Sequence, residues 1–147
     1  MEGMMNEFIS AAENDDKETL SSLIEKGFDV NYQKHVHYRD NIYHGHSLLS
    51  MSVLSENVDL VSLLFDNGAD PRLSIYENGE TYSDLPYYLS NEHLSRTMCH
   101  SAPYVTKFGF LVSAVFEQKK LLDNPEKRDE ILPRIKELLS NAKDATA

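Results

Sequence analysis

The sequence predicts an all-α fold in which short helix-turn-helix units repeat along a single domain, residues 1–147. Two observations predict it. A run of apolar residues followed by a glycine and an aspartate occurs twice, with the glycines at Gly27 and Gly68. Before each glycine, two short segments carry apolar residues at helical spacing. Because one unit of this kind cannot bury its apolar face alone, we expect the units to stack.

The composition limits the class of protein. Hydrophobic residues make up 41% of the chain and the mean hydropathy is -0.46, which fits a soluble globular domain. The sequence has neither a membrane-spanning stretch nor a secretory leader, so we expect a cytoplasmic protein. Cys99 is the only cysteine, which excludes an intrachain disulfide and a zinc site built from several cysteines.

The formal charge of -10 is unevenly distributed. Residues 1–92 hold 17 acids and five bases, whereas residues 93–147 carry two more bases than acids. Such a field repels nucleic acid and anionic lipid, so neither is an expected partner, and it accelerates the encounter with a basic protein. The alternative is that the acidity only keeps a soluble protein monomeric.

The two clearest units have matching parts. In the first, helices are predicted over 8–14 and 17–26, separated at Asp15 or Asp16. In the second, helices are predicted over 47–55 and 58–67. The glycine that follows each second helix can adopt the left-handed conformation that ends a helix, and the next aspartate can hydrogen-bond the following turn.

The second unit resembles an ankyrin repeat. The residues that carry the resemblance are Gly45-His46-Ser47-Leu48-Leu49-Ser50-Met51-Ser52-Val53, then Leu63-Leu64, then Gly68-Ala69-Asp70. Its ending is close to the family pattern, whereas Ser47, Leu48 and Ser50 replace the family's threonine, proline and histidine. The resemblance implies a solenoid of about four units with short β-hairpin fingers. We place the units at about 5–33, 43–75, 77–104 and 108–144, the last two irregular.

The later units depart from the pattern. The third begins near Asn78-Gly79, but Pro86 interrupts its first helix. In the fourth, an inner helix is predicted over 110–116 and an outer helix over 130–141, with residues 121–129 as an inserted loop. Pro133 lies near the start of that outer helix, where proline is tolerated only within the first turn.

The first finger is predicted to be extended. Gly27 and Gly68 are 41 residues apart, about eight more than the family period, and the surplus falls within residues 32–46. With Asp40-Asn41 as a two-residue turn, this segment forms a long hairpin. That turn places His35 opposite His46 and His37 opposite His44, on one side of the ribbon.

Four histidines on one side of a ribbon suggest a metal hypothesis. His35, His37, His44 and His46 could supply nitrogen ligands to zinc or copper, but no carboxylate or thiol at suitable spacing completes the set. The alternatives are contact with a partner and plain solvated histidines, and no cofactor is predicted. A pH effect is a further possibility, since protonation would bring like charges together.

No sequence motif indicates an enzyme. Cys99-His100 is the only adjacent pair of a nucleophile and a base, and sequence neighbours point in different directions on a helix or strand. There is no phosphate-binding glycine loop and no metalloprotease motif. We therefore expect a non-catalytic protein.

The resemblance implies binding through a concave face made of finger tips and inner helices. Tyrosine suits such a face because it buries much area at a small entropy cost. With the tip of the extended finger added, the residues assigned to partner contact are His37, Tyr38, Arg39, Asp40, Tyr43, His44, His46, Leu54, Ser55, Glu77, Asn78, Glu80 and Tyr88.

The expected function is that of a small acidic inhibitor of the immunity-protein or antitoxin type. Such a protein is monomeric by itself and blocks a basic partner such as a toxin or nuclease. This expectation rests on analogy of size and charge. The alternatives are an effector or scaffold that docks a host or cellular protein, and a metal-binding finger.

Overall fold

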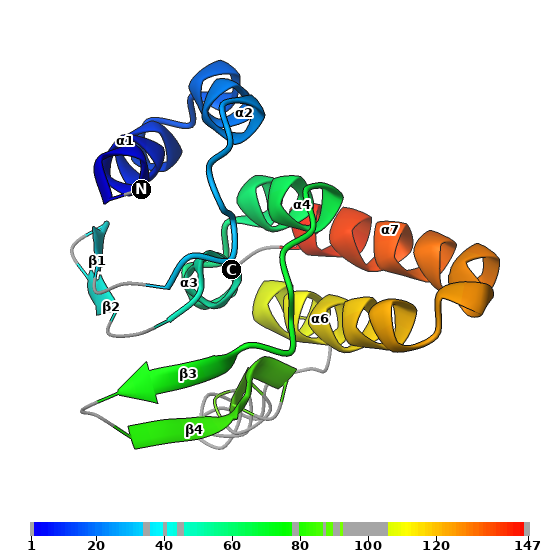
Figure 1. Cartoon of the computed structure of the whole chain (residues 1–147). Helices are drawn as coiled ribbons and strands as arrows, with labels where there is room; N and C mark the ends of the chain where they lie inside the picture. The colour runs from blue at the N-terminus through cyan, green and yellow to red at the C-terminus, as the bar shows by residue number, and fades with distance from the viewer. Residues whose placement is uncertain are drawn as a thin grey trace.

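A computed structural model of the chain describes residues 2–33, 36–39, 41–43, 46–77, 80–86, 88–89, 92 and 106–145. Helices dominate this part of the chain and form three helix pairs, with one short hairpin before the second pair and another after it (Figure 1). The helices are α1 (Glu2–Glu13), α2 (Lys17–Glu25), α3 (Leu48–Leu54), α4 (Val58–Asp66), α6 (Lys107–Asp123), the 3-10 turn η1 (Pro125–Lys127) and α7 (Arg128–Asp144). The strands are β1 (Val36–Tyr38), β2 (Asn41–Tyr43), β3 (Ser74–Glu77) and β4 (Glu80–Asp84).

The first two helix pairs, α1–α2 and α3–α4, are built from equivalent residues 41 positions apart. Each pair turns at a residue with positive φ, which is Asp15 at 54° in the first and Glu56 at 58° in the second. The next residue, Asp16 or Asn57, caps the second helix by accepting a hydrogen bond from the backbone N–H three residues further on. The sequence repeat is therefore also a repeat of backbone conformation.

Both pairs also end in the same way. Gly27 and Gly68 have φ of 99° and 84°, the left-handed region that glycine adopts without a Cβ clash. The residue after each glycine, Phe28 or Ala69, donates its backbone N–H to the carbonyl five residues earlier. This arrangement satisfies a carbonyl at the helix end, so the glycines end α2 and α4 as predicted.

Asn31 connects the two units. Its side-chain oxygen accepts a hydrogen bond of 2.7 Å from the backbone N–H of Asp70, and its Nδ2 donates one of 3.2 Å to the carbonyl of Gly68. Below these loops, the apolar faces of the helices form a continuous core. Phe8 and Phe28 stack there with ring centroids 4.7 Å apart. Burial of each large side chain in such a core stabilises the fold by about 1.5–3 kcal/mol.

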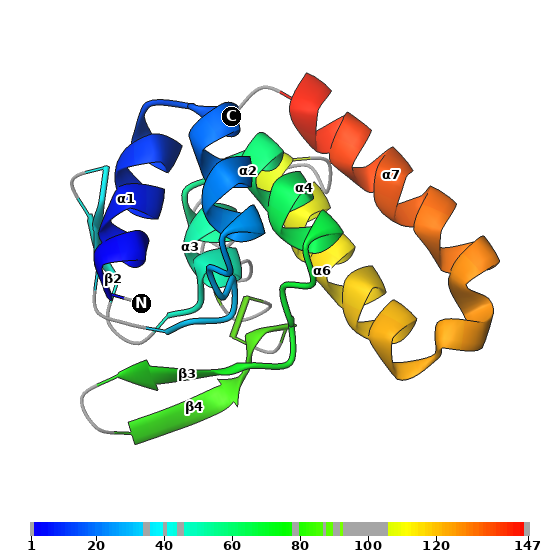
Figure 2. The same ribbon diagram turned by 45° about the horizontal axis from the view of Figure 1, so that its top comes forward.

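The last pair is longer than the first two. Helices α6 and α7 each have 17 residues, so each extends about 25 Å. They lie side by side in both ribbon views (Figures 1 and 2) and bury Leu111, Val115 and Ile135 between them and the rest of the core. Arg134 of α7 also donates to the Oε1 atom of Glu117 of α6 at 3.3 Å. This pair forms one end of the molecule.

These elements correct the predicted fold class. The described part of the chain is mainly helical, as expected, but the predicted solenoid of about four units is wrong. The strands β3 and β4 occupy the place where the third unit was expected to begin. The predicted loop over 121–129 is mostly helical, because Leu121 and Leu122 continue the apolar positions of α6 and Pro125 stands at the start of a helical turn, where proline is tolerated.

Candidate protein-binding surface

The hairpin of β1 and β2 lies within the segment predicted as an extended finger, but its register differs from the prediction. Tyr38 pairs with Asn41 and His37 pairs with Ile42, so the chain turns one residue earlier than the predicted Asp40-Asn41 turn. The predicted pairing of His37 with His44 is therefore wrong. Tyr43 lies opposite Val36 at the other end of the hairpin.

Tyr38 is a core residue, which corrects its assignment to the exposed tip. Its side chain is fully buried, and its hydroxyl oxygen accepts a hydrogen bond of 3.0 Å from Nδ2 of Asn57. Asn57 also caps α4 with its side-chain oxygen. One polar side chain thus holds both the finger and a helix start, and Tyr38 is unable to contact a partner without local unfolding.

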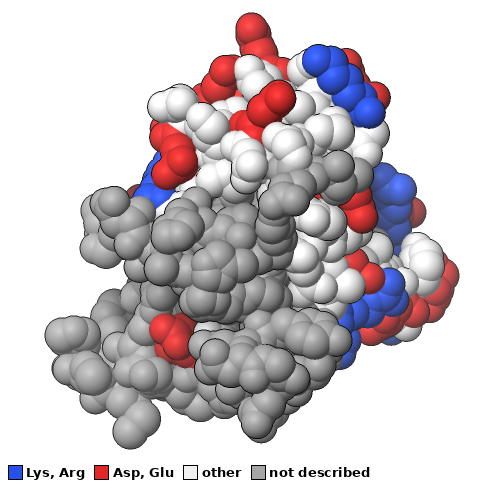
Figure 3. Space-filling model, turned by 60° about the vertical axis from the view of Figure 1, so that its left-hand side comes forward, with Lys and Arg blue, Asp and Glu red and all other residues white. Residues whose placement is uncertain are grey.

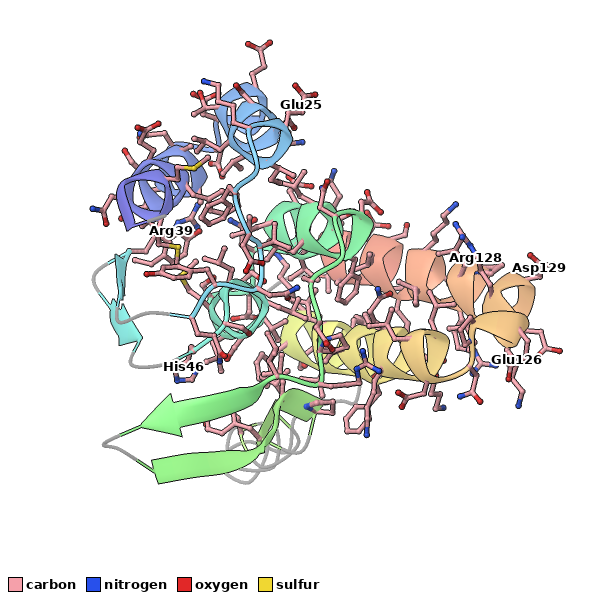
Figure 4. The ribbon with its side chains drawn as sticks, in the orientation of Figure 1. Glu25, Arg39, His46, Glu126, Arg128 and Asp129 are labelled. Atoms are coloured by element: carbon pink, nitrogen blue, oxygen red, sulfur yellow. The ribbon has the colours of Figure 1, made fainter. Side chains whose placement is uncertain are left out.

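Arg39 is half-exposed, but its backbone and side chain both contact other residues of the chain. Its backbone N–H donates to Glu13 at 3.1 Å, its guanidinium lies 3.4 Å from Asp15, and its Cζ atom lies 5.2 Å from the centroid of the Tyr38 ring. Figure 4 shows Arg39 between α1 and β1. Its positive φ of 47° fits a position fixed by these contacts. Arg39 therefore fastens the hairpin to the end of α1.

His46 is buried, contrary to its assignment to a solvent-facing set. Its Nδ1 atom lies 2.7 Å from Oγ of Ser50, and its ring meets the edge of Tyr88 at 5.5 Å between centroids. Ser47, the residue in place of the family's threonine, caps α3 by accepting from the backbone N–H of Ser50. The serines at these two positions therefore fix the start of α3.

The remaining predicted contact residues are scattered. Leu54 and Ser55 are half-buried at the end of α3, and Tyr88 is half-buried beside His46. The backbones of Glu77 and Glu80 face each other across the β3–β4 hairpin. The predictions that lie outside the described residues concern His35, Asp40, His44, Asn78, Cys99 and His100.

The metal hypothesis has little geometric support. Within the described ranges, no group of three or more histidine, cysteine, aspartate or glutamate side chains is placed to hold a metal ion. Of the four histidines proposed as ligands, His35 and His44 lie outside these ranges. The ring of His46 already contacts Ser50 through Nδ1 and packs against Tyr88.

The strongest surface feature of the described residues is acidic. Residues 2–33, which contain α1 and α2, hold eight acids and two lysines. Four exposed glutamates define what we name the acidic surface: Glu7 and Glu13 on α1, with Glu18 and Glu25 on α2. Figure 3 shows acidic side chains gathered over the region of these helices, at the top of the molecule, and Figure 4 shows Glu25 pointing away from α2.

Three of these glutamates carry charges that no base of the described chain pairs. Within the described part of the chain, Glu7, Glu18 and Glu25 form no ion pair, whereas Glu13 accepts the backbone N–H of Arg39. The nearby Asp15 is also engaged by Arg39. The acidic surface was not among the predicted contact residues, although the charge asymmetry of the sequence pointed to it.

Two other carboxylates have structural roles. The hydroxyl and the backbone N–H of Thr19 donate to the Asp16 side chain and lower the pKa of Asp16. The guanidinium of Arg72 donates to Asp70 at 2.9 Å and lowers the pKa of Asp70, while Asp70 in turn raises the pKa of Arg72. Arg72 also pairs with Asp123 at the end of α6, at 3.2 Å. These groups stabilise helix ends and the contact with the last helix pair.

Comparisons with family models, curated proteins and solved structures give no match for this chain. Among the described residues, no helix is both long enough and apolar enough to cross a membrane.

Proposed function

We propose that this chain is a non-catalytic, cytoplasmic protein-binding module that blocks a basic partner protein, in the manner of an immunity protein or antitoxin. The observation that carries the proposal is the acidic surface of α1 and α2. Its exposed carboxylates are not neutralised by bases of the described chain. The proposed partner is a basic toxin or nuclease, because such proteins present the cations that complement this surface.

Electrostatic complementarity favours a basic partner over a neutral one. A carboxylate that leaves water at an interface is stabilised only if a cation or hydrogen-bond donor replaces the water. Glu7, Glu18 and Glu25 would remain unpaired against an apolar or acidic surface. A basic partner pairs them and is also attracted over a distance, which accelerates association.

The scaffold beneath the acidic surface supports preorganised binding. Both helix pairs are capped, both end in left-handed glycines, and Asn31 connects their loops. A surface held in one conformation loses less conformational entropy on binding than a mobile one. The resemblance of these units to ankyrin repeats agrees with a binding role, although their resemblance alone names no partner.

The proposal is tested by affinity capture of a partner from lysate of the source cells, with the full chain as bait. The test variant neutralises the unpaired glutamates by Glu7→Gln, Glu18→Gln and Glu25→Gln. A matched control removes three exposed acids at the other end of the molecule by Glu126→Gln, Asp129→Asn and Glu137→Gln. Both variants have the same formal charge, so a general charge effect acts on both equally.

We expect a basic protein in the captures made with the wild type and the control, and its loss with the test variant. Expression of that protein alone should arrest growth, and co-expression of the wild type should relieve the arrest. A partner that both variants capture equally well contradicts a role for the acidic surface. Capture without relief of any activity of the partner contradicts the inhibitory function and favours a docking role.

A further inference from the structure

A second surface lies at the opposite end of the molecule, where α6 and α7 extend beyond α4. Helix α4 has nine residues, whereas α6 and α7 have 17 each, so the last pair exceeds α4 by about two turns. Figures 1 and 2 both show the η1 ends of α6 and α7 projecting past α4. Helix α4 therefore covers only the first part of the α6–α7 pair and leaves the rest of the pair uncovered.

A groove follows the uncovered part of the pair. It begins at Phe65 near the end of α4 and runs between α6 and α7 towards Pro125 in η1, with a volume of about 550 Å³. Its walls carry apolar side chains that are only partly buried, unlike those beneath α4. These are Leu121 and Leu122 of α6 and Leu132 and Leu139 of α7.

Two cations of α7, Arg128 and Lys136, line the same groove. Both are exposed, and neither forms an ion pair with another described residue. Figure 4 places Arg128 where η1 meets α7. Asp66 at the end of α4 is the one acid that lines the groove, against these two cations. The groove therefore has positive net charge on a chain whose formal charge is -10.

We propose that this groove binds an acidic amphipathic helix of another protein. The helix occupies the place beside α4 that the long α6–α7 pair leaves open, with apolar side chains against the four leucines and acidic side chains towards Arg128 and Lys136. A helical occupant fits because the groove continues the layer that α4 begins, and helices bind apolar grooves through side chains spaced by three and four residues. This inference concerns a different surface from the proposed function and does not rest on it.

The probe is a fluorescein-labelled peptide of about 15 residues, long enough for helix formation, with leucines on one face and glutamates beside them. Fluorescence anisotropy measures its binding to the full chain. We expect saturable binding at a Kd of about 0.1 mM or lower, no saturation with a scrambled peptide of the same composition, and weaker binding of a lysine analogue. Failure of the ordered peptide to saturate at about 1 mM protein overturns the proposal.

Variants locate the site. Arg128→Glu with Lys136→Glu should weaken peptide binding about tenfold or more, and Leu132→Ala should weaken it by a similar factor. The control Lys26→Glu with Lys127→Glu makes the same charge change at exposed lysines that do not line the groove, and it should bind better than the groove variant. Equal loss in both double variants overturns the assignment, provided that thermal unfolding shows each variant to be folded.

Sedimentation at increasing protein concentration distinguishes a heterologous helix from a second copy of this chain. A monomer at all concentrations supports the proposal. A dimer that Arg128→Glu with Lys136→Glu dissociates would assign the groove to self-association and overturn it.

Discussion

Asn31, Asp70 and Arg72 show how single side chains hold this fold together. Both polar atoms of the Asn31 amide are used to reach the loop of the second helix pair, at Gly68 and Asp70. Asp70 then binds Arg72, which contacts Asp123 of the last pair. A chain of short polar contacts thus connects all three helix pairs.

Replacement of Asn31 by alanine should lower the free energy of unfolding by about 1–2 kcal/mol, because the backbone N–H of Asp70 and the carbonyl of Gly68 lose their partner. Urea denaturation of the full chain measures the change. Asn6→Ala is the matched control, since Asn6 is exposed on α1, and it should change the stability by less than about 0.5 kcal/mol. Equal effects of the two substitutions would show that Asn31 does not connect the units.

The stability of the protein should fall in acid through Asp70. Because Arg72 lowers the pKa of Asp70 in the folded chain, the unfolded chain binds a proton at this carboxyl more tightly. The stabilisation is therefore complete above the ordinary pKa of 3.8 and disappears as the pH falls through the lowered folded value.

Asp70→Asn should reduce this loss of stability at low pH. Asparagine retains a hydrogen-bond acceptor for the backbone N–H of Arg72. Unfolding free energies measured between about pH 2.5 and pH 6 test it. Asp66→Asn, at an exposed acid without a partner among the described residues, is the control. Identical pH profiles for the two variants would contradict the role given to the Arg72–Asp70 pair.

Residue roles in the hairpin show why the exposed placement of Tyr38 and the pairing of His37 were wrong. The sequence places Tyr38 between two polar residues, so its aromatic ring could equally face solvent or core. The structure buries it because Asn57, 19 residues further on, satisfies its hydroxyl. A contact between such distant residues has no local signal, and neither does the pairing of His37 with Ile42, which depends on the turn position.

At the scale of elements, the helix ends were the most predictable features. Gly27 and Gly68 end α2 and α4, and the turn at Asp15 and Asp16 separates the first two helices, as expected from their chemistry. The sequence predicts a last pair that is too short, because Pro125 favours a loop and Pro133 favours a late helix start. In the structure Pro125 begins η1 and Pro133 lies within α7.

Pro133→Ala should therefore stabilise the protein. Pro133 is the sixth residue of α7 and has no N–H for the carbonyl of Asp129, so alanine restores a helical hydrogen bond. We expect a gain of about 1–3 kcal/mol and a higher Tm by several degrees in a thermal melt. Ser140→Ala, at an exposed position of the same helix, serves as the control, with a change of about 0.5 kcal/mol or less. An unchanged or lower Tm for Pro133→Ala would show that the helix does not continue through this residue.

At the scale of the whole molecule, the sequence predicted helix pairs and their repetition but not their arrangement. The 41-residue repeat could be recognised because caps, turns and closing glycines are local signals. The long α6–α7 pair could not be derived from the repeat pattern, since its helices are fixed by packing against each other and by Glu117 and Arg134. The predicted solenoid of about four units therefore extends beyond the two units that support it.

The acidic surface and the groove differ in charge. The first helix pair presents unpaired carboxylates, whereas the uncovered part of the last pair presents Arg128 and Lys136 beside an apolar groove. Separate surfaces at the two ends of one scaffold allow two partners to bind without competition. The acidic surface is the basis of the proposed function.

The central claim is that this surface binds a basic partner, and isothermal titration of the purified, captured partner tests it most directly. Between about 0.05 M and about 0.5 M NaCl, we predict that the Kd of the wild type rises at least tenfold, because salt screens exposed charges. Glu7→Gln with Glu18→Gln and Glu25→Gln should weaken binding at low salt and reduce this salt dependence, whereas the variant with Glu126→Gln, Asp129→Asn and Glu137→Gln should behave as the wild type. A Kd that neither salt nor loss of the three α1–α2 glutamates changes would contradict the proposed function.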